Sequence, residues 1–109
     1  MDSCGGLWMK GALVGKSVGT FVSVGTQGGG QETVNLSFIP FCVHQGMVYV
    51  PMGYIEPKVF SYDEVHGSSA YGCGTYAGSD GSRQPTDLEK EIAEVHGKHF
   101  ATITSKLAA

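Results

Sequence analysis

The stretch from Val18 to Gln31 reads VGTFVSVGTQGGGQ, and it decides the fold. Its first half, Val18–Val24, is almost continuously apolar and rich in β-branched and aromatic side chains. That composition is typical of a strand buried on both faces. The glycine-rich half, Gly25–Gly30, follows at the carboxyl end of this strand. Because ligands of open α/β sheets bind at that end, the loop is a candidate ligand site.

The residues after the loop predict a helix and a second strand. We expect the helix from about Gln31 to Gln45, kinked or interrupted at Pro40 and closed by Gly46 as a left-handed cap. Met47–Pro51 is a second apolar strand, so strand, loop, helix and strand form a βαβ unit. The apolar stripe expected on the helix consists of Val34, Phe38, Phe41 and Cys42.

The flanking segments are more varied. Residues 2–16 read as the frayed end of a helix followed by a loop, and residues 53–85 read as irregular, with one short strand at Gly74–Ala77. The last helix opens on Thr86-Asp-Leu-Glu89, which fits a capping box. Its expected apolar stripe is Leu88, Ile92, Val95, His99, Ile103 and Leu107. We expect Glu89–Glu94 to form its solvated face, and Asp63, Glu64, Asp80 and Arg83 to be solvated loop charges.

These elements predict an α/β fold that is incomplete. Two apolar strands joined by one helix imply a parallel sheet with helices on both faces. A chain of 109 residues with so few strands leaves an apolar edge and face of that sheet bare, and bare edges promote pairing. The sequence therefore predicts a missing partner, either an N-terminal half or another subunit.

Composition excludes several classes of function. The formal net charge is −3 and the seven Lys and Arg are scattered, whereas nucleic-acid binders show a basic face. No stretch is apolar and long enough to cross a bilayer. Cys4, Cys42 and Cys73 are far apart and form no CxxC pair, and the histidines have no metal-ligand spacing, so we expect no metal site. Three reduced thiols indicate a cytoplasmic protein.

Several segments, in order, resemble the signature segments of WrbA-type NAD(P)H:quinone oxidoreductases. They are GGLWMKGALVGK (5–16), SVGTQGGGQET (23–33), VHQGM (43–47), VYVPMGY (48–54), YGCGTYAG (71–78) and SDGSRQP (79–85). The resemblance implies a flavodoxin-like fold, a three-layer parallel sheet, of which residues 1–109 form the C-terminal part of a single domain. It also implies FMN as cofactor, NADH or NADPH as co-substrate, a quinone as substrate, and a homo-oligomer, a tetramer in the family.

The resemblance also assigns site residues. The segment around the flavin ring corresponds to Ser23, Val24, Gly25, Thr26, Gln27 and Gly28, whose backbone N–H groups suit the electron-rich atoms of the ring. The family histidine beside the flavin corresponds to His44, and a tryptophan from a neighbouring subunit corresponds to Trp8. Tyr54 is a further candidate for the pocket wall.

From the residues alone, each of these assignments has an alternative. The glycine loop also fits an ordinary tight turn between strand and helix, although it matches neither the P-loop nor the G-x-G-x-x-G pattern. His44 also fits a helix C-terminal histidine stabilised by the helix dipole. Trp8 also fits a core or interface anchor.

The resemblance implies two-electron reduction of quinones, with the flavin carrying the chemistry and no side chain acting as an indispensable acid or nucleophile. The family's phosphate-binding loop lies in its N-terminal half and has no counterpart here, and Pro40 departs from helix-friendly residues. An alternative follows from this difference. The chain is then a catalytically inactive, truncated subunit that acts as an interaction or dominant-negative partner.

Overall fold

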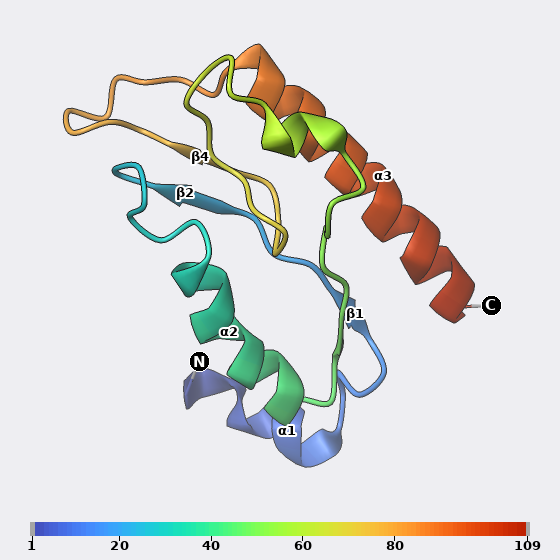
Figure 1. Ribbon diagram of the computed structural model, residues 1–109. Coiled ribbons are helices and arrows are strands. Elements are labelled where there is room, and N and C mark those ends of the chain that lie inside the picture. Colours follow the sequence, from blue (N-terminus) through green and yellow to red (C-terminus); the bar gives the residue numbers. More distant parts are fainter. Residues whose placement is uncertain (1, 109) are drawn as a thin grey trace.

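The computed structural model describes residues 2–108 as a mixed α/β arrangement of short elements (Figure 1). In chain order these are η1 (Asp2–Cys4), α1 (Gly5–Lys10), β1 (Ser17–Val18), β2 (Val22–Val24), α2 (Thr33–His44), β3 (Val48–Tyr49), η2 (Pro57–Phe60), β4 (Gly74–Tyr76) and α3 (Asp87–Ala108). The βαβ unit, the short strand near residue 75 and the long last helix predicted from the sequence are all present. Among residues 2–108, no helix combines the length and the hydropathy needed to cross a membrane.

Within residues 2–108 all strand pairing is parallel, and it is made along one edge of residues 17–24. β1 pairs with β3, and β2 pairs with β4. The amide of Val50 donates to the carbonyl of Val18 at 2.8 Å, and the amide of Val22 donates to the carbonyl of Cys73 at 3.2 Å. β3 and β4 therefore lie one after the other beside a single stretch of chain.

Between β3 and β4 the chain leaves the sheet and returns. The excursion closes where the amide of Gly53 donates to the carbonyl of Ala70 at 2.7 Å. The hydroxyl of Tyr49 donates to the carbonyl of Tyr71 at 2.7 Å, which fixes the returning chain against β3. A Cβ atom at Gly72 would lie 1.9 Å from the carbonyl oxygen of Thr20. Only glycine permits this approach of the two backbones.

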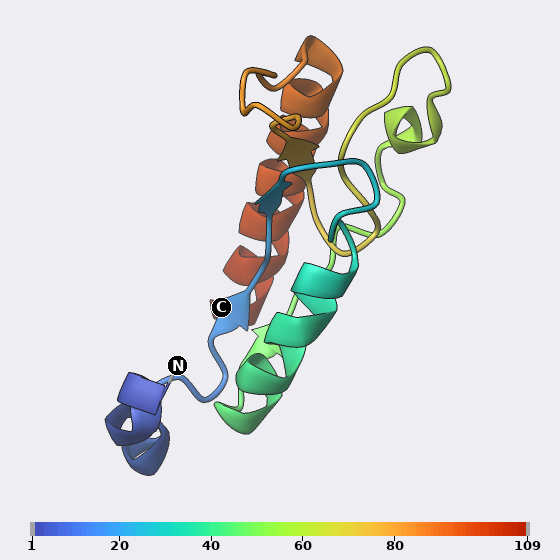
Figure 2. The ribbon, with the colours of Figure 1, turned by 90° about the vertical axis from the view of Figure 1, so that its left-hand side faces the viewer.

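The two long helices cover the sheet from different sides. Figures 1 and 2 show the β1–β2 stretch between α2 and α3. α3 contributes the fully buried Ile92 of its predicted stripe, whereas Leu107, the last residue predicted for that stripe, is exposed. α2 continues through Pro40. Gly46 follows the helix with a left-handed φ of 75°, as predicted for its cap.

The predicted stripe of α2 is partly wrong. Cys42 is buried, but Val34 is exposed, and the buried residue in the first turn is Asn35. Asn35 is tolerated there because its Nδ2 donates to the carbonyl of Gln31 at 2.7 Å. Its amide group therefore satisfies a backbone acceptor next to the start of the helix.

The prediction of one strand buried on both faces over Val18–Val24 is also wrong. The ladder is interrupted at residues 19–21, and Phe21 is 79% exposed. The physical reason is that β3 pairs with residues 17–18 and β4 with residues 22–24, so residues 19–21 have no paired strand within residues 2–108. The structure thus shows two two-stranded parallel pieces where we expected a three-layer sheet.

Glu89 corrects the expectation of a solvated face at the start of α3, because its side chain is 3% exposed. The predicted capping box is confirmed: Thr86 N donates to Glu89 Oε1 at 2.9 Å, and Glu89 N donates to Thr86 Oγ1 at 3.2 Å. Arg83 Nη1 lies 3.1 Å from Glu89 Oε1, so Arg83 is not a solvated loop charge either. Gly67 N and Thr75 Oγ1 donate to the same carboxylate at 2.7 and 2.8 Å.

Burial alone would raise the pKa of Glu89, but these hydrogen bonds to the carboxylate outweigh it and hold that pKa below its ordinary value. The glutamate thereby links α3 to β4 and to the end of the excursion. Its hydrogen bonds form a polar contact within the core of a chain that has few buried apolar side chains. The buried apolar side chains of residues 2–108 are Cys42, Val50, Met52 and Ile92.

Replacing Glu89 by glutamine is expected to lower the free energy of unfolding at neutral pH by roughly 3 kcal/mol, because the half-buried Arg83 loses the counter-charge of the buried Glu89 carboxylate. The depressed pKa stabilises the fold above the ordinary glutamate value of about 4.3. This stabilisation is lost as the pH falls through the folded-state pKa, so the two proteins should converge in acid. Urea unfolding followed by circular dichroism across this range measures both effects.

Glu91→Gln is the matched control, since Glu91 pairs with Lys58 on the exposed side of the same helix. Exposed pairs contribute little to stability, so this variant should unfold like the parent chain. Equal losses in both variants would contradict the role given to Glu89.

Candidate functional site

The glycine loop forms a compact turn between β2 and α2. Gly29 N donates to the carbonyl of Thr26 at 3.1 Å, and Gly28 has a left-handed φ of 65°. This is the position of a four-residue turn that favours glycine. Gly30, with φ 135°, then turns the chain into α2, where a Cβ atom would lie 2.8 Å from Val34 Cγ2.

The outer part of the loop has unused hydrogen-bond donors. The amides of Gly25, Thr26, Gln27 and Gly28 make no backbone hydrogen bond to any residue within 2–108. All four residues are exposed, as is Ser23, while Val24 is half-buried. Successive free amides on an exposed turn form a surface that binds electron-rich atoms.

Gln31 holds this loop in place. Its Nε2 donates to the carbonyl of Thr75 in β4 at 2.8 Å, and its Oε1 accepts the amide of Ser68 at 2.8 Å. Its own carbonyl accepts Asn35 Nδ2 and, at 3.2 Å, Ser69 Oγ. Sequence reasoning missed Gln31. The available signal was an amide side chain placed directly after three glycines and before a helix.

The start of α2 adds to the polarity of the site. A helix of 12 residues directs its positive end at the loop that precedes it. An open hollow of about 350 Å³ lies at this junction. Its lining consists of Gly28, Gly30, Gln31, Glu32, Thr33 and Leu36. The arrangement can therefore receive a polar, electron-rich group from solvent.

The other predicted site residues lie elsewhere in the chain. His44 is exposed at the far end of α2, and a helix of this length spans about 18 Å. Trp8 is 60% exposed on α1, and the loop after α1 contacts the segment at that same end of α2 through the Gly15 N to Gly46 carbonyl bond of 2.9 Å. Within one chain the structure therefore does not bring Trp8 or His44 beside the glycine loop.

Tyr54 belongs to the excursion between β3 and β4. Its ring stacks on Phe60 with centroids 5.0 Å apart, and both side chains are exposed. The pair forms an aromatic surface on the excursion, and no hydrogen bond joins Tyr54 to the glycine loop within residues 2–108.

No family model matches the chain. Individual relatives do. The chain is 53% identical over 107 residues to NAD(P)H quinone oxidoreductase PST3 of Candida albicans, covering 96% of this chain and 54% of that protein. It is 51% identical over 107 residues to quinone-oxidoreductase QR2 of Triphysaria versicolor, covering 97% of this chain and 52% of that protein. This chain is homologous to quinone oxidoreductases.

The homology confirms the resemblance found in the sequence segments. A second Candida albicans protein, NAD(P)H quinone oxidoreductase PST2, is 52% identical over 104 residues, covering 94% of this chain and 52% of that protein. The present chain thus spans about half the length of the curated relatives it matches. The glycine loop with its free amides belongs to the part that they share.

Hydrogen exchange tests the geometry of the loop. The amides of residues 25–28 should exchange at rates near those of an unstructured peptide, whereas those of Gly29 and Ser68 should be slower because each has an acceptor. Gln31→Ala should release the Ser68 amide and lower the free energy of unfolding by about 1–3 kcal/mol, since the half-buried partners of Gln31 lose their bonds.

Gln31→Glu is the control for this experiment, because a glutamate keeps the Oε1 acceptor for Ser68 and loses the donor to Thr75. Protection of the Ser68 amide should therefore survive in Gln31→Glu and vanish in Gln31→Ala. Slow exchange of residues 25–28 in the parent chain would show that their amides are engaged.

Proposed function

We propose that this chain supplies the flavin-ring loop of an FMN-dependent NAD(P)H:quinone oxidoreductase. The observation that carries the proposal is the row of unengaged amides at Gly25–Gly28. The homology supports it, because PST3 and PST2 are named NAD(P)H quinone oxidoreductases. The FMN part of the proposal rests on the geometry of the glycine loop.

The loop fits a flavin ring in three respects. Gly25 and Gly28 have no side chain to hold a flat ring away from the backbone. The amides of residues 25–28 are free to donate to the ring's oxygen and nitrogen atoms, and α2 directs its positive end to the same place. The chemistry that a bound FMN supplies is two-electron transfer from NADH or NADPH to a quinone.

The residues of the loop bind and orient the ring and do not exchange protons. Ser23, Thr26 and Gln27 carry neutral side chains, so the loop offers fixed dipoles and no titrating group. Preorganised N–H donors stabilise negative charge that develops on an acceptor without having to reorganise. Gln31, through Thr75 and Ser68, keeps those donors in position.

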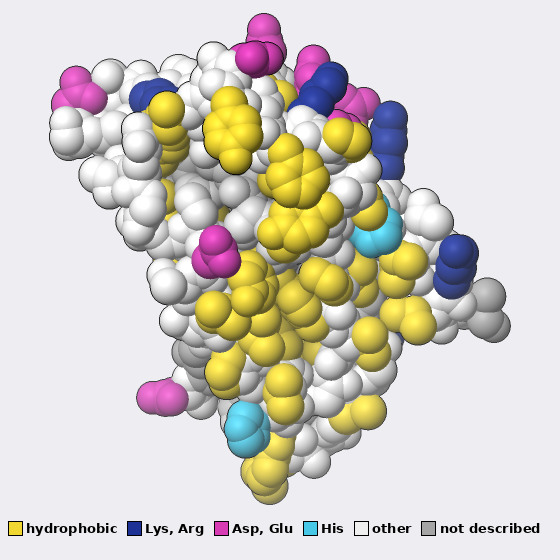
Figure 3. Space-filling model, in the orientation of Figure 1, with side chains coloured by type: hydrophobic (Ala, Val, Ile, Leu, Met, Phe, Trp, Pro, Cys, Tyr) yellow, Lys and Arg dark blue, Asp and Glu magenta, His cyan; other side chains and the backbone are white. Residues whose placement is uncertain are grey.

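Trp8, Tyr54 and His44 are assigned to the active site through a second copy of the chain. Trp8 and His44 lie at the opposite end from the glycine loop, so they reach a flavin only across an interface. Figure 3 shows apolar side chains gathered over the middle of one face, and exposed apolar residues of α2 and the excursion support an interface there. We therefore propose a homo-oligomer, a tetramer, in the cytoplasm, where Cys4, Cys42 and Cys73 stay as free thiols.

A second candidate function is that of an inactive subunit that associates with full-length relatives. It is favoured by the coverage, since about half of each relative has no counterpart in this alignment. We place the phosphate-binding loop of the cofactor in that unmatched half. The two candidates differ in whether this chain binds a flavin ring.

Flavin titration distinguishes the two candidates. If the chain supplies the ring loop, it should quench the fluorescence of FMN and of riboflavin with similar affinity, because riboflavin has the ring and lacks the phosphate. Oxidation of NADH on addition of benzoquinone would show that the bound flavin turns over. Quenching of neither flavin, with mixed oligomers formed with PST3, would establish the inactive subunit instead.

Gln27→Pro tests the role of the amides directly. Proline suits the second position of this turn and removes one N–H donor, so flavin affinity should fall by up to about ten-fold, the effect of one hydrogen bond. Gln27→Ala keeps the donor and should bind like the parent chain. Equal affinities of the two variants would contradict a backbone site.

A further inference from the structure

Cys73 and His96 form a thiol–imidazole pair on the α3 side of the sheet. Cys73 Sγ lies 3.3 Å from His96 Nδ1, within hydrogen-bond distance for sulfur. The amide of Cys73 donates to the same nitrogen at 3.2 Å. Because Nδ1 accepts from both groups, the neutral ring carries its hydrogen on Nε2. The pair therefore combines a nucleophilic sulfur, a proton acceptor and a proton donor.

Both members of the pair are held by the fold. Cys73 directly precedes β4, and its carbonyl accepts the amide of Val22 at 3.2 Å. His96 lies inside α3 and is 6% exposed. Cys73 is thus beside the start of β2, whereas the glycine loop follows the end of that strand. The pair is therefore separate from the flavin-ring loop.

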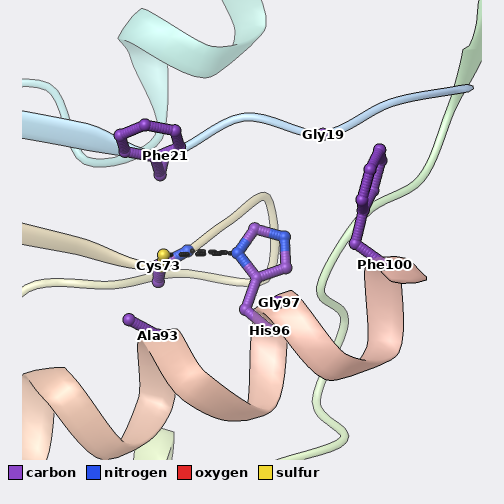
Figure 4. A pocket seen from close by; sticks show the side chains of 7 residues that line it. All are labelled: Gly19, Phe21, Cys73, Ala93, His96, Gly97 and Phe100. Carbon is purple, nitrogen blue, oxygen red and sulfur yellow. Dashed lines mark hydrogen bonds between the residues drawn. The ribbon is translucent and has the colours of Figure 1, made fainter. Parts of the chain in front are cut away.

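The pair opens on a mainly apolar cavity of about 250 Å³. The other residues that line this cavity are Gly19, Phe21, Ala93, Gly97 and Phe100 (Figure 4). A second cavity of about 260 Å³ shares Phe21, Cys73 and Ala93 with the first. Apolar walls with few polar groups are typical of sites that bind flat organic molecules. The space beside Cys73 therefore suits a compound of one or two fused rings.

The second nitrogen of His96 lacks a partner. Among residues 2–108, His96 Nε2 is one of three buried side-chain polar atoms without a hydrogen bond. Figure 4 shows this nitrogen on the side of the ring away from Cys73, toward Gly19 and Phe100. An unpaired buried N–H group is unfavourable, and an acceptor atom bound in the cavity would satisfy it. The cavity therefore suits a ligand with apolar surface and an acceptor beside His96.

Both partners are neutral at neutral pH. Burial raises the pKa of the Cys73 thiol. Burial, with a smaller effect of His99, lowers the pKa of His96. The thiolate that simple alkylation needs is therefore scarce at Cys73. A neutral thiol attacks where a base accepts its proton as the new bond forms, and His96 Nδ1 is in that position.

We propose that Cys73 and His96 form a conjugate-addition site for quinones. The quinone ring lies in the cavity with one carbonyl oxygen accepting from His96 Nε2, and Cys73 Sγ adds to the ring carbon β to that carbonyl. A quinone suits the site because it is flat and apolar and pairs an acceptor oxygen with an electrophilic carbon. The proposed function brings the same class of compound to the protein, but the addition requires neither flavin nor NAD(P)H.

The addition balances without an outside oxidant or reductant. The S–H bond breaks as the S–C bond forms, its proton passes to Nδ1, and the proton of Nε2 passes to the carbonyl oxygen. The substituted ring carbon then loses its hydrogen to solvent, while the second carbonyl oxygen gains one. The two carbonyls are thereby reduced to the hydroxyls of a hydroquinone, and the ring carbon that exchanges hydrogen for sulfur is oxidised. Proton exchange with water restores the original tautomer of His96.

A selectivity measurement on the parent chain tests the site. Naphthoquinone is added without flavin or NADH, and mass spectrometry of peptides gives the initial rates of modification at Cys73 and Cys4. Cys4 is the internal reference because it is also partly exposed and makes no side-chain hydrogen bond at the start of α1. Iodoacetamide, which alkylates thiolates by displacement, is the reference reagent. The Cys73-to-Cys4 rate ratio should be at least about ten-fold higher with naphthoquinone, because only the addition uses both nitrogens of the imidazole.

Matched variants assign this selectivity to His96 and to the cavity. His96→Gln keeps a donor and loses the base, so it should lower the naphthoquinone rate at Cys73 by about ten-fold or more and leave the iodoacetamide rate unchanged. Ala93→Phe narrows the cavity at an exposed position, so it should slow naphthoquinone more than the smaller iodoacetamide. Ala101→Phe, at an exposed alanine of the same helix outside the cavity lining, is its control and should react like the parent chain.

Two results would overturn the proposal. They are equal Cys73-to-Cys4 ratios with the two reagents, and a naphthoquinone selectivity that survives in both His96→Gln and Ala93→Phe. If His96→Gln fails to fold, the comparison of Ala93→Phe with Ala101→Phe decides the question alone. Since no flavin is present, a failure here is separate from a failure of the proposed function, which the flavin titration measures.

Discussion

The structure depends on the constraint that residues 17–24 carry the whole sheet on a single edge. β3 and β4 both bond there, at successive positions, and the glycine loop is positioned because it continues from β2. The bare opposite edge is the other consequence of the same constraint. The position of the glycine loop and the bare edge are thus both consequences of one extended segment.

Polar side-chain contacts join elements of this chain that apolar packing would hold together in a larger domain. The enclosed apolar core is small, and two side chains link elements that are distant in sequence. Gln31 connects the start of α2 to β4 and to Ser68, and Glu89 connects α3 to β4, Arg83 and Gly67. Such contacts are directional, so they set the positions of loops more tightly than hydrophobic burial does.

The sequence predicted elements that depend on local signals. The capping box at Thr86–Glu89, the long helix after it, the cap at Gly46 and the strand at Gly74 follow from short-range chemistry, and the homologous segments identified the relatives. It did not predict the burial of Glu89 or the contacts of Gln31, because those depend on residues 14–44 positions away along the chain.

The exposed Phe21 illustrates a second limit. An apolar run such as Val18–Val24 indicates how a strand is buried in a complete sheet, and it cannot tell which edge lacks a neighbour in the chain at hand. In the same way, the location of His44 at the far end of α2 follows from helix length and could not be seen in the matching segments alone.

The excursion between β3 and β4 has an evolutionary consequence. Its two ends are joined by the Gly53–Ala70 hydrogen bond, so the chain departs and returns at neighbouring points. Lengthening such a loop adds little closure entropy, and the ladder on either side does not depend on what lies between. Descendants of this fold can therefore remodel the excursion, with its aromatic pair, as a separate module and acquire new surface chemistry while the sheet register is inherited unchanged.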